Sequence, residues 1–188
     1  MDTIIKDDYL PIIRDDHLMV RHIFRYLINY LYEHKENDHL DMDFINAIII
    51  FLDTYLIPVH FKREEEVLFK EFEDLSIPIY VQSEIKNIIH RHMTISNFVS
   101  ELSLLRRQYE TGSNSKINEI HSIMGLLTLS FNKLVIEQEK LFPKIDQYLT
   151  DLLKEKIKNG LNKFNENIII QMVQQHIIEA YKKYDNHQ

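Results

Sequence analysis

Apolar residues recur three and four positions apart along most of the chain, which is the pattern of helices with one buried face. Polar or proline-containing segments interrupt this pattern at residues 37–41, 77–78 and 111–115. The stretches between them cover about residues 8–36, 42–75, 79–110 and 116–149. Short connections between long helices favour antiparallel neighbours. We therefore expect an all-α fold, an up-down-up-down antiparallel four-helix bundle over residues 1–150.

Residues 151–188 show one or two further amphipathic patterns, interrupted near residues 160–167. We expect a C-terminal helical extension that packs on the bundle or lies at an interface. Within the second long stretch, Pro58 removes one backbone hydrogen bond, which predicts a kink just before His60.

Composition narrows the classes of function. The 188 residues include no cysteine, which excludes disulfides and thiolate metal sites, and only three glycines, which argues against a glycine-rich phosphate loop. The net charge of −7 argues against a nucleic-acid partner. No uninterrupted apolar run is long enough to span a membrane and no signal peptide is visible, so we expect a cytoplasmic protein without a membrane partner.

Three of the ten histidines interrupt apolar rows that are spaced as on one face of a helix. These are His17, His60 and His92, and each is expected to face the core. His22 and His90 share their helix faces with polar residues and are expected to be exposed. Each buried imidazole must be desolvated and hydrogen-bonded, so three of them in one small core suggest a common role.

The sequence His60-x-x-x-Glu64 places an imidazole and a carboxylate on one helix face, where both can reach one metal ion. An imperfect repeat of this motif follows 73 residues later, Lys133-x-x-x-Glu137, with lysine in place of histidine. Both copies are followed by Leu-Phe, so the two pairs appear at equivalent places in the repeat.

Counting residues from the loops, at about 1.5 Å of rise per residue, brings five side chains to one height. They are His17, His60, Glu64, His92 and Glu137. Buried carboxylates at one level are best stabilised by cations, so this layer predicts a metal site. The alternative is a polar core network or a charged surface face.

At these residues the chain resembles the hemerythrin-like, or HHE cation-binding, family over roughly residues 8–150. The resemblance implies a four-helix bundle around a non-haem iron centre, with two iron ions expected and one as the alternative. It implies that Glu64 bridges the ions, that His17 and His60 bind one iron, and that His92 and Glu137 serve the other.

Lys133 departs from the family pattern, because it stands where the fourth helix usually carries a histidine. A protonated lysine cannot bind a metal, and its charge could pair with Glu137 and replace one cation. Three outcomes follow: a di-metal centre with an asymmetric second site, a single metal with Lys133 replacing the other, or a metal-free bundle.

The resemblance implies a protein that binds, senses or reduces a small ligand such as dioxygen, nitric oxide or peroxide. Whether it is an enzyme is left open by the sequence. The alternative is a regulatory or interaction module with a mononuclear or lost metal site. In that case the C-terminal segment would contact a second copy of the chain or another protein.

Overall fold

The computed structural model describes residues 9–34, 39–73, 75–112 and 116–165. These residues form helices and contain no strand, which confirms the all-α prediction. The elements are α1 (Leu10–His34), α2 (Met42–Phe51), η1 (Leu52–Phe61), η2 (Glu64–Leu68), η3 (Phe69–Phe72), α3 (Ile79–Glu110), α4 (Ile117–Asp146) and α5 (Asp151–Asn165).

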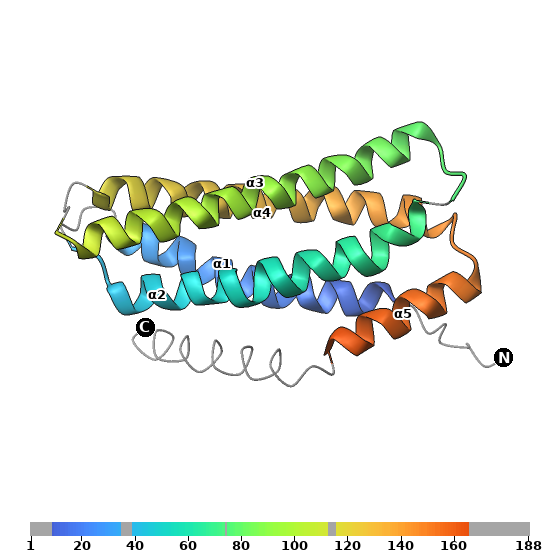
Figure 1. The fold of residues 1–188 in the computed structure, drawn as a ribbon, viewed down its shortest axis with the longest axis horizontal. Helices are drawn as coiled ribbons and strands as arrows, with labels where there is room; N and C mark the ends of the chain where they lie inside the picture. The colour runs from blue at the N-terminus through green and yellow to red at the C-terminus, as the bar shows by residue number, and fades with distance from the viewer. Residues whose placement is uncertain (1–8, 35–38, 74, 113–115, 166–188) are drawn as a thin grey trace.

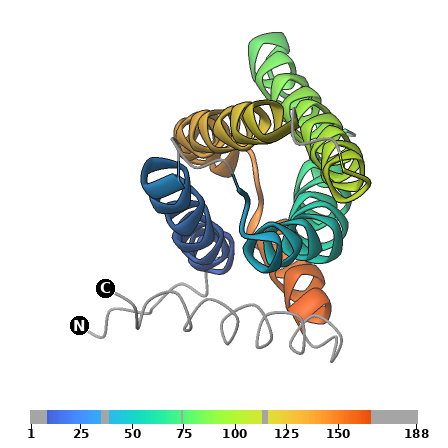
Figure 2. The ribbon, with the colours of Figure 1, turned by 90° about the vertical axis from the view of Figure 1, so that its left-hand side faces the viewer.

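Four long stretches lie side by side around a shared interior: α1, the run from α2 to η3, α3 and α4 (Figures 1 and 2). Successive stretches run in opposite directions in Figure 1. Helix α4 packs against α1 and α3, and α3 also packs against α2 and η1. Aromatic pairs tie the interior together, with ring centroids 4.6 Å apart for Phe24 and Phe131.

The second stretch changes its helical geometry where it approaches His60. After α2 it continues as the π-helix η1, which contains Pro58, and a second π-helical segment, η2, begins at Glu64. Proline lacks the amide donor of a regular helix, and π-helical turns are often found at functional sites. Pro58 and His60 both lie inside this π-helix, and the predicted kink just before His60 stays a prediction.

The same stretch, Met42–Phe72, has a window of mean hydropathy 1.7 and is long enough to cross a membrane. The sequence predicts no segment apolar enough to span a membrane when only uninterrupted apolar runs are considered. That expectation does not hold for the mean hydropathy of this window. However, 56% of the window is buried inside the fold, as in the core helix of a soluble protein. Hydropathy by itself therefore assigns no membrane role to this helix.

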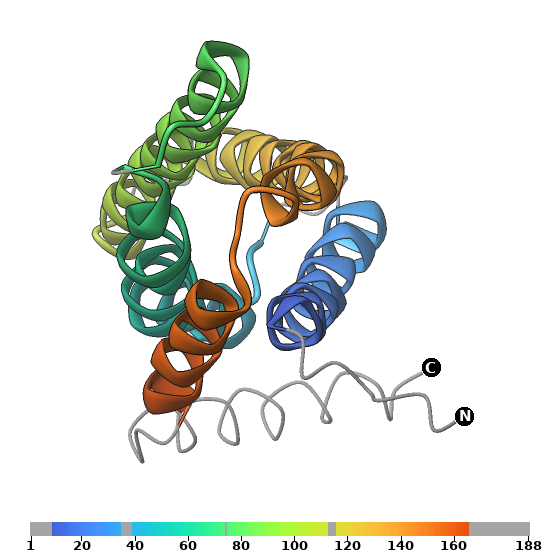
Figure 3. The same cartoon turned by 90° about the vertical axis from the view of Figure 1, so that its right-hand side faces the viewer.

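Helix α5 folds back onto the second stretch, where it contacts η2 (Figure 3). Ile157 and Leu161 are fully buried, and Lys156 pairs with Glu71 at 2.7 Å. An interruption was predicted near residues 160–167, and α5 continues through Gly160 to Asn165, so no interruption lies within the described part of that range. The rest of the expected extension, residues 166–188, lies outside the described residues.

Candidate metal centre

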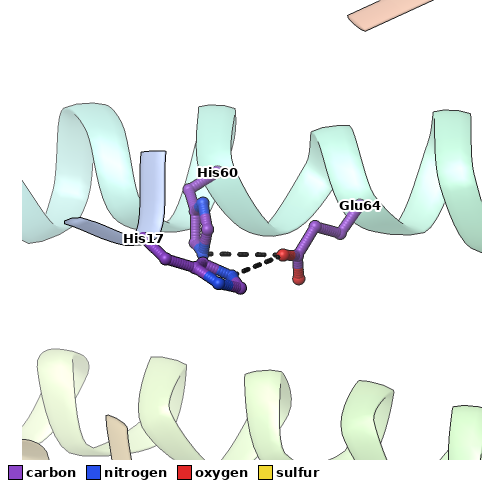
Figure 4. Close-up of side chains that lie close together, drawn as sticks. All are labelled: His17, His60 and Glu64. Atoms are coloured by element: carbon purple, nitrogen blue, oxygen red, sulfur yellow. Dashed lines mark hydrogen bonds and ion pairs between the residues drawn. The ribbon is translucent and has the colours of Figure 1, made fainter. Parts of the chain in front are cut away.

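Four of the five predicted ligands lie together in the core. His17 comes from α1, His60 from η1, Glu64 from η2 and His92 from α3. None of them is more than 2% exposed. Three helical stretches that are far apart in the sequence therefore supply one buried cluster, and Figure 4 shows three of its members.

The Glu64 carboxylate is the centre of this cluster. Its Oε1 lies 3.0 Å from Nε2 of His17 and 3.8 Å from Nε2 of His60. Its Oε2 lies 3.3 Å from Nε2 of His92. All three imidazoles thus direct the same ring nitrogen, Nε2, at one carboxylate.

The other nitrogen of two of these rings is fixed by a carboxylate. Nδ1 of His60 donates a hydrogen bond to Asp16, and Nδ1 of His92 lies 2.7 Å from Oε1 of Glu65. An ionised carboxylate only accepts hydrogen bonds, so Nδ1 carries a proton, and whenever such a ring is neutral its Nε2 lone pair faces the cluster. This is the arrangement by which proteins orient metal-binding histidines.

Several buried nitrogens of the cluster lack a hydrogen bond. Among the described residues these include Nε2 of His60 and Nε2 of His92, both of which face Glu64. Leaving buried polar atoms unpaired is costly. A cation between the imidazoles and Glu64 would satisfy both nitrogens, so the residues present fit a metal ion.

Distances and donor types agree with this interpretation. The donor atoms of His17, His60 and Glu64 lie within 4.8 Å of one another. Ligand atoms that are each about 2 Å from one ion are separated by about 3–4 Å, so a small inward movement is enough. Imidazole together with carboxylate suits iron, zinc, copper or nickel.

Electrostatics of the cluster also favour a positive charge. Burial raises the pKa of Glu64, but His60, His17 and His92 outweigh it and hold this pKa well below its usual range. Burial lowers the pKa of His92, whereas Glu64 and Glu65 raise it, and the net direction is upward. Without metal, protonated imidazole can compensate Glu64, and a metal ion would replace that proton.

Glu137 does not join the cluster, contrary to the expectation of five converging side chains. Its carboxylate is about one-third exposed and forms a bidentate ion pair with Arg91 of α3, with one contact at 2.7 Å. The next residue, Gln138, is fully buried and donates its amide to Glu64. One residue turns an α-helix by about 100°, so Glu137 and Gln138 belong to different faces.

Lys133 is exposed on α4 and does not face the cluster. The buried row of α4 runs instead through Leu134 and Gln138, and it carries no histidine there. The expected pairing of Lys133 with Glu137 is likewise not seen, since Glu137 pairs with Arg91. Lys133 is therefore not placed to replace a metal ion.

Sequence reasoning missed a buried polar group behind His60. Asp16 accepts hydrogen bonds from His60 and Tyr55 and forms an ion pair with Arg63. Burial raises the pKa of Asp16, but His60 and Arg63 outweigh it, so the net shift is downward. The sequence did contain a signal for Arg63. It follows Val59, which is buried, by four residues, and this spacing places both side chains on one helix face.

The chain matches no protein-family model, no curated protein and no solved structure in the comparisons made.

Proposed function

We propose that the protein is a hemerythrin-like metal-binding protein, with iron as the first candidate, whose core ion binds or senses a small ligand. The observation that carries this proposal is the convergence of three imidazole Nε2 atoms on the Glu64 carboxylate. We further propose that the four long stretches form an up-down-up-down four-helix bundle, a fold that builds metal sites from facing helices.

Each residue of the cluster has a definite part in this proposal. His17, His60, His92 and Glu64 would hold the ion, while Asp16 and Glu65 orient two of the imidazoles. Such a ligand set leaves a coordination position open, and the ion would supply binding of dioxygen, nitric oxide or peroxide there. Apolar neighbours such as Phe61, which stacks on His92 at 4.1 Å, exclude bulk water.

Metal analysis of protein from iron-replete cells tests this proposal. Wild type should retain iron, His60→Ala should lose most of it, and the exposed control His90→Ala should retain it. Addition of nitric oxide to the reduced protein should change its EPR spectrum only in the two metal-containing forms. A wild-type protein that holds no iron, and binds neither ferrous iron nor zinc on titration, would contradict the proposal.

A second candidate function is a regulatory module, favoured by the docking of α5. This helix packs on η2, the segment that carries Glu64. Metal binding could then alter how firmly α5 is held. Limited proteolysis within α5, compared with zinc and with a chelator, should differ strongly if this candidate is right, and no ligand reduction should be seen.

A further inference from the structure

Arg63 is a permanent cation in the interior of the protein. Only 2% of its side chain is exposed, and its guanidinium pairs with Asp16. The oxygen of Asp16 that pairs with Arg63 also accepts the hydrogen bond from His60 Nδ1, while Tyr55 donates to the other oxygen. A chain of contacts therefore runs from Arg63 through Asp16 to a proposed metal ligand.

The buried charges define how many cations the core can hold. Among the described residues, the buried carboxylates are Asp16 and Glu64, and Arg63 is the buried group that stays charged at every physiological pH. Arg63 compensates Asp16, which leaves the negative charge of Glu64 for an added ion. A second divalent ion would lack a buried carboxylate of its own and would repel Arg63 at low dielectric constant.

We propose that Arg63 takes the place of a second metal ion, so that the core binds one divalent cation, and that Asp16 positions His60 for it. This inference rests on the proposed function for the metal and on geometry alone for the role of Asp16. Arg63 is then the buried positive charge that replaces a metal ion, a role that the sequence had suggested for Lys133.

The position of Asp16 explains why it suits this role. It precedes His17 on α1, so one turn of helix provides both a ligand to the site and the acceptor that orients His60 on η1. Arg63 lies one residue before Glu64, so the second stretch places the internal cation and the central carboxylate together. The charge pair thereby links the two helices that hold His17 and His60.

The first test counts metal ions and compares charge-matched variants. Zinc titration by calorimetry should give one equivalent for wild type. Asp16→Leu/Arg63→Met removes both charges and keeps the local net charge, and apolar replacement of a buried ion pair usually preserves folding. It should weaken zinc binding by about 10–100-fold, the usual effect of losing a partner of a metal-binding histidine. The surface pair variant Arg91→Met/Glu137→Gln should bind zinc like wild type.

The second test needs no metal. Nitrogen NMR of the metal-free protein should show His60 with its proton on Nδ1, and this preference should be lost in Asp16→Leu/Arg63→Met. Two zinc equivalents in wild type, or wild-type affinity in the double variant, would overturn the inference. A wild-type protein that binds neither zinc nor ferrous iron would contradict the proposed function and the internal cation, while the NMR result would still decide whether Asp16 orients His60.

Discussion

At the scale of single residues, the neighbouring pair Glu137 and Gln138 decides what α4 contributes to the site. Gln138 presents a neutral amide donor to Glu64 inside the core, so it satisfies one carboxylate oxygen without adding charge. Glu137 pairs with Arg91 at the half-buried edge between α3 and α4. These isosteric side chains therefore allow a direct experimental comparison.

We expect Gln138→Glu to destabilise the metal-free protein by about 2–4 kcal/mol at neutral pH, because two carboxylates would then meet in the interior. The loss of unfolding free energy relative to wild type should be smaller at lower pH, since a protonated carboxyl can again donate a hydrogen bond to its neighbour. Urea unfolding with a chelator, at pH 7 and pH 5, measures both effects.

Glu137→Gln is the matched control for this prediction. It removes an ion pair that is about one-third exposed, so it should cost less than about 1 kcal/mol. A larger cost for Glu137→Gln than for Gln138→Glu would show that Glu137, not Gln138, faces the cluster.

The burial of single polar side chains was predicted correctly from the sequence where the residue stood in a row of apolar residues on one helix face. His17, His60 and His92 are buried as expected because their helical neighbours are apolar. Glu137 was misplaced because the two repeats were aligned on their Leu-Phe pairs. The first repeat lies in π-helical turns and the second in a regular α-helix. The same spacing along the sequence therefore does not point the corresponding side chains toward the same side of the helix.

At the scale of elements, the contact of α5 with η2 depends on Gly160. A Cβ atom at this position would lie 2.6 Å from Cγ1 of Val67, which is too close without movement of a stiff β-branched side chain. By contrast, a Cβ at Gly125 of α4 would meet nothing within 4 Å. The two helical glycines thus differ in the space that a Cβ atom would find around them.

We expect Gly160→Ala to destabilise the protein by roughly 1–2 kcal/mol, because the cost of overpacking exceeds the gain in helix propensity. Gly125→Ala should instead stabilise it by about 0.5–1 kcal/mol. In a Val67→Ala background, Gly160→Ala should also become stabilising. Thermal or urea unfolding of the four variants measures these signs, and equal stabilisation by both glycine replacements would rule out the close contact.

Helical periodicity predicted which segments are helices, but tertiary packing decided their details. The long stretches appear close to their expected bounds because their 3.6-residue pattern is strong. The π-helical turns and the continuity of α5 through Gly160 are not contained in the local 3.6-residue pattern.

At the scale of the whole molecule, the cluster joins helices that are otherwise connected by separate contacts. His17 and His60 belong to stretches separated by the first loop, and His92 lies beyond the second. An ion bound to all three would cross-link α1, η1 and α3 through the core. Metal binding should therefore stabilise the entire fold and not only the residues around the ion.

Added zinc or ferrous iron should raise the melting temperature of the chelator-treated protein. A ligand at 100 times its dissociation constant stabilises the folded state by about 2.7 kcal/mol, which corresponds to roughly 5–10 °C for a chain of this size. Differential scanning calorimetry measures the shift, and a chelator should reverse it. Glu64→Gln should lose most of the shift because it removes the central carboxylate, whereas the surface variant Glu137→Gln should keep it. If Glu64→Gln and wild type respond equally, the ion binds elsewhere, because every imidazole of the cluster faces Glu64.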